Sequence, residues 1–319
     1  MLNVVETATG IVIASIPINE KTNEITTIPK VLALVAVAGN FFTIDAIGTY
    51  IPIIEGIYSE DGSFGLQVKK NNPKAYESLK LFFDQQEENR KDAEEAAAGN
   101  VPPEENLHYE STGWQVEMNR ERVEYRCCEA VHIGVEYAND KLGRALLGED
   151  SALAFGAPYF CTLAWITTVR IPREYDADNN EVTPTREEFL KSGSRKCPNP
   201  TEGDSEQDPI QRIGFISNLD LSAEEILSRK RRHWSCESTH HILDVTFRED
   251  ECNARVAKFN ASLIRKLAYN IVRLALYSGD IEDECSSKVL RCRVCHRDSL
   301  LKKYLFSRLP RIHMAEEAS

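Results

Sequence analysis

Residues 229–245 read RKRRHWSCESTHHILDV, and the interpretation of the whole chain depends on this stretch. Four basic residues lead into a segment that carries His233, Glu237, His241 and Asp244. On a helix these positions are spaced i, i+4, i+8 and i+11, so they share one face. Such a stripe is either a solvated surface with internal ion pairs or part of an active site, in which a metal-holding acid lies beside phosphate-binding bases.

Composition places the chain among ordinary globular proteins. Of its 319 residues 42% are hydrophobic and 28% are charged, which leaves room for a core and about two domains. Nine cysteines with irregular spacing indicate reduced thiols. The N-terminus lacks the basic region of a signal peptide, and no apolar run reaches the roughly 18 residues of a spanning helix. We therefore expect a cytoplasmic protein with no membrane contact.

Charge is distributed unevenly along the chain. The formal net charge of −12 argues against a nucleic-acid partner, because phosphate contact needs Lys and Arg. The segment 288–311 nevertheless carries eight basic residues against the single acid Asp298. These are Lys288, Arg291, Arg293, Arg297, Lys302, Lys303, Arg308 and Arg311. Local distribution matters more than the sum, so this basic tail keeps DNA among the possible partners.

Apolar patterning predicts strands that alternate with helices, which indicates an α/β layer. The first part of the chain predicts a hairpin over 3–18, helices over 24–37, 47–59 and 75–97, and strands over 41–45 and 63–69. The later part predicts strands over 122–133, 159–171 and 211–217, a loop over 171–210, and a helix over 256–277. Ser222 and Glu225 match a capping box, which predicts that a helix begins there and includes the opening stretch.

Three further sequence features each have a functional interpretation and a simpler, non-functional one. Asp45 ends an apolar strand, where open α/β sheets place ligands, but it equally suits a cap of the next helix. His240 and His241 could bind zinc, although neither an HExxH pattern nor a matching cysteine pair accompanies them. Cys292 and Cys295 begin a CxxCH string, which would attach haem in an exported protein, but it lies among bases and without an export signal. We therefore expect neither zinc nor haem.

Five stretches together resemble the DDE transposases of bacterial insertion sequences, of the H-repeat-associated type found with Rhs elements. In chain order they are KTNEITTIP at 21–29, TIDAIG at 43–48, VKKNN at 68–72, RVEYR at 122–126 and RRHWSCESTHHILDVTFRED at 231–250. The last stretch is long and specific, and it aligns with the family segment that holds the catalytic Glu. The match runs in order along nearly the whole chain.

The resemblance implies an α/β fold: an RNase H-like mixed sheet flanked by helices and interrupted by a largely β insertion. Residues 1–98 and 211–277 would form the two parts of the catalytic domain, with the insertion at 99–210 and a basic tail at 278–319. Helices within 220–277 would then pack on a sheet from residues 1–70.

The resemblance also implies the site and its partners. Asp45 and Glu237 would be the second and third acids of the triad and would hold Mg²⁺ or Mn²⁺, which activate the attacking oxygen in strand cleavage and transfer. DNA contacts would come from Lys69, Arg231, His233 and Trp234. The expected partners are transposon ends, target DNA and a second copy of the chain, with no small-molecule substrate. A DNA-bound fraction would associate with the nucleoid.

The chain also departs from the family pattern. The family's first Asp lies in an Asp-Gly-Lys motif on a central strand upstream of the segment that begins at Met1, so we expect this strand and this acid to be missing. Asp244 is a poor substitute, because it lies about 10 Å along the same helix from Glu237. The expectation is a truncated or inactive transposase; the alternative is a non-catalytic DNA- or protein-binding remnant.

Overall fold

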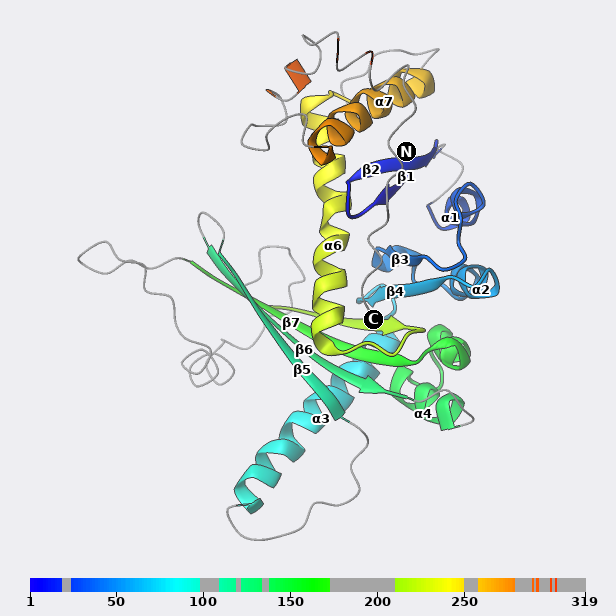
Figure 1. Ribbon diagram of the computed structural model, residues 1–319. Coiled ribbons are helices and arrows are strands. Elements are labelled where there is room, and N and C mark those ends of the chain that lie inside the picture. The colour runs from blue at the N-terminus through cyan, green and yellow to red at the C-terminus, as the bar shows by residue number, and fades with distance from the viewer. Residues whose placement is uncertain are drawn as a thin grey trace, which may run out of the picture. The chain divides into compact units, whose positions relative to one another are not determined.

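The computed structural model (Figure 1) describes most of the chain, in two compact units. The described ranges are 1–18, 24–97, 109–118, 122–133, 138–172, 210–249 and 258–278, with the single positions 289, 291, 292, 299 and 302. The first unit combines Met1–Val35 with Arg232–Ser319, and the second unit is Ala36–Arg231. The predicted loop at 171–210, apart from its two ends, and most of the basic tail lie outside the described residues.

A six-stranded mixed sheet forms the second unit, in the order β3-β4-β8-β7-β6-β5. Its strands are β3 Phe41–Ile44, β4 Ser63–Val68, β5 Tyr109–Met118, β6 Arg122–His132, β7 Thr162–Pro172 and β8 Ile210–Ser217. Strands β3 and β4 are parallel, and every other neighbouring pair is antiparallel. The predicted mixed α/β architecture with flanking helices is therefore confirmed, whereas the RNase H-like arrangement stays a prediction. The strands of the expected insertion continue the same sheet through β8.

Helices cover both faces of this sheet. On one face, α3 (Pro73–Ala97) places Tyr76 and Phe83 against Trp165 of β7, with ring centroids 5.2 and 6.2 Å apart. On the other face, the first turns of α6 (Ala223–His241) bury Ile226 and Leu227 against apolar residues of β6, β7 and β8. Shorter helices complete the unit: η1 Ala46–Gly48, α2 Ile51–Ser59, α4 Ala138–Leu147 and η2 Ala152–Tyr159.

Helix α6 begins at the predicted capping box. The backbone N–H of Ser222 donates to Glu225 Oε2 over 2.8 Å, and the N–H of Glu225 donates to Ser222 Oγ over 3.3 Å. These bonds satisfy two of the donors that a helix start leaves open. The α-helix ends at His241, and Ile242–Thr246 forms a π-helical turn, η3, in which the Phe247 N–H donates to Ile242 O over 3.2 Å.

The first unit joins an N-terminal hairpin to a helix from the other end of the chain. Strands β1 (Leu2–Glu6) and β2 (Ile11–Ile16) form a separate two-stranded sheet, on which α1 (Glu24–Leu32) and α7 (Lys258–Tyr277) pack. The core contains Ile11, Val12, Leu243, Phe247, Tyr269, Val272, Leu274 and Ala275. The described helices are all too short or too polar to cross a membrane.

The single sheet predicted for residues 1–70 is wrong, because the hairpin does not pair with β3. Asn270 of α7 explains the difference. Its side-chain amide accepts from the Val12 N–H over 2.9 Å and donates to the Val12 carbonyl over 2.8 Å. These are the backbone groups of β2 that face away from β1, so a helix side chain satisfies them where a further strand would otherwise be needed.

Candidate functional site

The carboxyl ends of the parallel strands β3 and β4 bring two of the predicted site residues together. Asp45 follows β3 directly, and Lys69 follows β4. The Lys69 ammonium lies 3.2 Å from Asp45 Oδ1, and the Asp45 side chain is 62% exposed. The same carboxylate oxygen accepts the Ala46 N–H over 2.7 Å. Asp45 therefore caps η1, as the plain alternative predicted, and its charge still faces solvent.

The loop after β4 also holds the loop after β3. Asn71 donates to the Ala46 carbonyl over 2.7 Å, Asn72 donates to the Thr49 carbonyl over 3.4 Å, and the Thr49 hydroxyl donates to the Gln67 carbonyl over 2.7 Å. Two stretches that resemble transposase motifs, 43–48 and 68–72, are thus joined by side-chain hydrogen bonds. This arrangement restricts the backbone on both sides of the Asp45 carboxylate.

Glu237, His233 and Trp234 lie on the part of α6 that belongs to the first unit. Glu237 and Trp234 are exposed, and His233 is partly buried. Two residues after Glu237, the buried Thr239 hydroxyl lies 3.0 Å from the Tyr269 hydroxyl of α7, which anchors this end of the helix. Because Asp45 and Glu237 belong to different units, their approach to a common metal ion stays a prediction.

The predicted stripe is α-helical as far as His241. Asp244 lies in the π-helical turn η3, beyond the last α-helical residue. A π-turn has more residues per turn than an α-helix, so the α-helical i+11 spacing does not apply to Asp244, and its place on the face of Glu237 stays a prediction.

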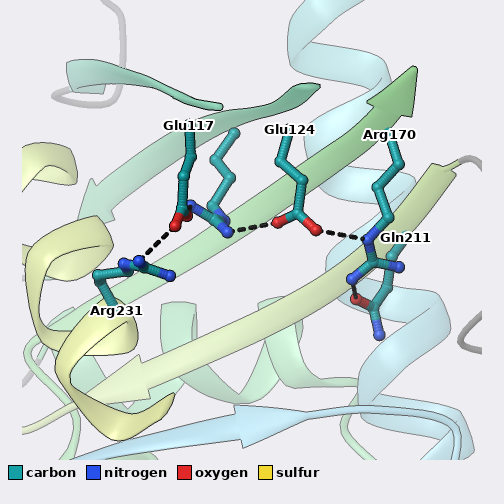
Figure 2. Close-up of polar contacts among 6 residues, drawn as sticks. Glu117, Glu124, Arg170, Gln211 and Arg231 are labelled. Atoms are coloured by element: carbon teal, nitrogen blue, oxygen red, sulfur yellow. Dashed lines mark hydrogen bonds and ion pairs between the residues drawn. The ribbon is translucent and has the colours of Figure 1, made fainter. Parts of the chain in front are cut away.

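A row of alternating charges crosses the face of the sheet on which α6 packs (Figure 2). We call it the charged ladder; its members are Arg231, Glu117, Arg126, Glu124, Arg170 and Gln211. Arg231 pairs with Glu117, and Arg126 lies 2.8 Å from Glu117 and 2.5 Å from Glu124. Arg170 Nε lies 3.1 Å from Glu124 and its Nη2 donates to Gln211 over 3.4 Å. The ladder therefore links α6 to strands β5, β6, β7 and β8.

Strand register places two carboxylates of the ladder directly opposite each other. Glu117 of β5 pairs with Glu124 of β6, and Glu124 pairs in turn with Arg170 of β7. Like charges at such cross-strand positions destabilise a sheet. Arg126 lies two residues along β6 on the same face, and its guanidinium binds both carboxylates. The attraction of both carboxylates to the Arg126 guanidinium therefore offsets the repulsion between them.

Lys230 is a lysine whose surroundings disfavour the charged form of its amine. It precedes Arg231 on α6 and is partly buried. Burial, followed by the charges of Arg126 and Lys69, lowers the pKa of Lys230 to about 7. The positive charges of Arg126 and Lys69 therefore act on the same amine and disfavour its protonated form.

Replacing Lys230 with methionine should stabilise the protein. The folded-state pKa lies below the ordinary 10.5, so wild-type stability is lost as pH falls from about 10 towards 7. At pH 7 we expect Lys230→Met to raise the free energy of unfolding by about 1–4 kcal/mol. The gain should shrink towards pH 10, because the amine of the unfolded chain then begins to lose its own proton near its ordinary pKa of 10.5. Urea unfolding at both pH values, with Lys80→Met on α3 as control, measures this; an equal gain at the two pH values would contradict it.

The donor chemistry around Asp45 suits a hard divalent cation, which prefers carboxylate oxygens. Asp45 Oδ1 accepts from the Ala46 N–H and from the Lys69 ammonium. Within the described ranges, no group of three or more His, Cys, Asp or Glu side chains is arranged to hold a metal. For His240 and His241 this also means that no zinc cluster forms among the described residues.

Comparison with known proteins identifies the family. The family model described as Transposase DDE domain matches residues 1–271. The chain belongs to this family. The DDE-domain chain is also similar to two Escherichia coli proteins, "H repeat-associated putative transposase YhhI" of strain K12 and "Putative transposase YncI" of O157:H7.

These relatives are distant and longer than the DDE-domain chain. The K12 protein is 23% identical over 278 residues, which is 85% of this chain and 57% of the relative. The O157:H7 protein is 25% identical over 284 residues, which is 86% of this chain and 56% of the relative. The chain thus spans a little over half the length of the curated relatives it matches.

Sequence reasoning missed most of the charged ladder. Only Arg231 had been predicted to have a functional role, while Glu117, Arg170 and Gln211 had none. One signal was available: RVEYR at 122–126 alternates charge with apolar residues, which places Glu124 and Arg126 on one face of a strand. The partners on β5, β7 and α6 could not be read from it, because they depend on strand register.

Proposed function

We propose that this DDE-domain chain carries out metal-dependent DNA strand cleavage and transfer, with Asp45 and Glu237 as two of its acids. The observation that carries this proposal is the meeting of Asp45 with Lys69 at the ends of β3 and β4, reinforced by Asn71. A carboxylate beside a lysine at that edge of a sheet suits a phosphate group with its metal. Transposition is an activity of the whole protein, and we propose it because the chain belongs to the DDE transposase family.

Each side chain has a defined part in the proposed reaction. Divalent ions, when bound, would activate the attacking oxygen and stabilise the leaving oxygen. Asp45 and Glu237 would hold them, and the hydrogen bonds of Ala46 and Asn71 would keep the Asp45 loop in position before DNA arrives. Lys69 would move from Asp45 to a phosphate oxygen when an ion takes the carboxylate. Arg231 would bind the DNA backbone on the α6 side.

Iron-directed cleavage tests the metal-binding part of the proposal. Fe²⁺ replaces Mg²⁺ at carboxylate sites and, with ascorbate and peroxide, cuts the peptide backbone near the bound ion. We expect fragments that end near residues 45 and 237, and we expect Mg²⁺ to suppress both. Asp45→Asn and Glu237→Gln should each weaken both cuts, whereas Glu60→Gln at the end of α2 should leave them unchanged. Cuts at only one of the two positions would contradict a shared site.

A non-catalytic DNA-binding role is the second candidate. It is supported by the basic segment 288–311. An assay on DNA that bears the element's terminal repeats separates the two functions. Mg²⁺- or Mn²⁺-dependent cleavage that Glu237→Ala abolishes would support the enzyme; DNA binding without cleavage would support the second role.

The basic tail should contribute a salt-sensitive component of DNA binding. If about four of its cations contact phosphates, the slope of log affinity against log salt should be near −4. A chain that ends at residue 287 should bind a duplex of arbitrary sequence more weakly and with a shallower slope. Equal binding by the shortened and the full chain, measured by fluorescence anisotropy, would show that the tail is not the contact.

A further inference from the structure

We propose that Glu117 acts as an internal substitute for a DNA phosphate: its carboxylate holds the Arg231 guanidinium, and a backbone phosphate displaces it when DNA binds. This inference rests on the proposed function, in which Arg231 contacts DNA. It adds that Glu117 competes with a DNA phosphate for Arg231, and that this competition governs the affinity of the Arg231 contact.

The charge balance of the ladder allows this exchange. Arg126 and Arg170 offset the charges of Glu117 and Glu124, so these four residues are neutral together. Arg231 adds one further positive charge at the end of the row. When Arg231 leaves, Glu117 retains Arg126 at 2.8 Å, so no carboxylate is left buried without a cation. The exchange therefore avoids the large cost of an unpaired buried charge.

Solvent exposure of the side chains determines which ion pair of the ladder a phosphate can displace. The Arg231 side chain is 42% exposed, whereas those of Arg126 and Glu124 are 13% and 5% exposed. A phosphate can reach Arg231 from solvent, but the inner pairs of the ladder are shielded. Carboxylate and phosphate present similar pairs of oxygen atoms to the guanidinium fork, so one can replace the other with little change in side-chain geometry.

The surroundings favour the incoming anion. Arg229, Lys230 and Arg232 flank Arg231 on α6, and Arg229 is fixed over the Phe41 ring of β3 at 4.3 Å. A DNA backbone, with one negative charge on each successive phosphate, gains from these charges, while the single charge of Glu117 is shared with Arg126.

Anisotropy titrations of the full-length chain with a labelled duplex of arbitrary sequence test the exchange. Glu117→Gln keeps an acceptor for Arg126 but weakens the competitor for Arg231, so DNA affinity should rise about three- to tenfold, in line with the loss of one charged contact. Glu60→Gln removes the same charge outside the ladder and controls for net charge. In an Arg231→Gln background, Glu117→Gln should have no more effect than Glu60→Gln.

Arg231→Gln alone gives a second measurement that does not need a Glu117 variant to fold. It should reduce the magnitude of the salt slope by about 1, since one phosphate contact is lost. Arg212→Gln on β8 removes a positive charge that pairs with Asp84 outside the ladder, and provides the matched control. An unchanged slope in Arg231→Gln overturns the proposal, as does an effect of Glu117→Gln that persists without Arg231. If the full chain binds no DNA even at low salt, the proposed function itself is wrong.

Discussion

Replacing Arg126 with methionine is expected to lower the free energy of unfolding by about 3–5 kcal/mol. Arg126 binds both Glu117 and Glu124, which lie directly opposite each other on β5 and β6. Its loss leaves two facing carboxylates, one of them almost fully buried, with Arg231 and Arg170 as their remaining cations. Urea unfolding followed by circular dichroism at neutral pH measures the change.

Two variants show whether charge is the cause of this loss. Arg212→Met on β8 removes the same side chain from an exposed pair with Asp84 at 3.8 Å, so it should cost about 1 kcal/mol or less. Adding Glu124→Gln to Arg126→Met should restore part of the lost stability, because it removes one of the facing charges. A double variant that is less stable than Arg126→Met alone would show that the packing of the arginine, and not its charge, explains the loss.

Replacing Lys266 with methionine should have a similarly large effect in the first unit. The Lys266 side chain is 3% exposed, and its ammonium lies 2.7 Å from Glu249 Oε1 and 2.5 Å from the Ser262 hydroxyl. Within the described residues, the other carboxylate oxygen of Glu249 has no hydrogen-bond partner. Removing the lysine therefore leaves a largely buried carboxylate with Ser262 as its remaining donor, at a cost of about 3–5 kcal/mol.

The double variant Lys266→Met with Glu249→Gln is the control for this prediction. It removes both charges and keeps an acceptor for Ser262, so it should recover most of the lost stability. If the double variant recovers none of the lost stability, the loss in Lys266→Met comes from missing packing volume and not from an unpaired charge. Lys30→Met on the exposed side of α1 provides a lysine substitution without a buried partner, and we expect a change within about 0.5 kcal/mol.

The same pair predicts how stability depends on pH. Burial by itself would raise the pKa of Glu249, but the hydrogen bonds from Lys266 and Ser262 outweigh it, so the net pKa is lowered. A carboxyl whose folded-state pKa is lowered contributes stability above its unfolded value of about 4.5, and this contribution is lost as pH falls below that value. Wild-type stability should therefore decrease on acidification, and Glu249→Gln should decrease less steeply over the same range.

Local patterns in the sequence determined most of the secondary structure. The alternation and apolar runs that predicted strands at 41–45, 63–69 and 211–217 reflect side chains that must point into a core, whatever the neighbouring strand is. The capping box at Ser222 needs only four consecutive residues, so its hydrogen bonds follow from sequence alone. The family was also recognisable from sequence, because its motifs are short, ordered stretches.

Tertiary structure decided which charges meet. Glu117, Glu124 and Arg170 share a row because β5, β6 and β7 pair in one register, and a shift of a single residue would have turned their side chains to opposite faces. Glu117 and Glu124 lie on consecutive strands, but Arg170 and Arg231 come from distant segments, so no local pattern contains their pairings. The same holds for Asn270, whose side chain bonds both backbone groups of Val12 although the two residues are 258 positions apart in the sequence. Short-range periodicity determined which residues are inside, whereas the pairing of distant segments brought Arg170 and Arg231 to the two acids.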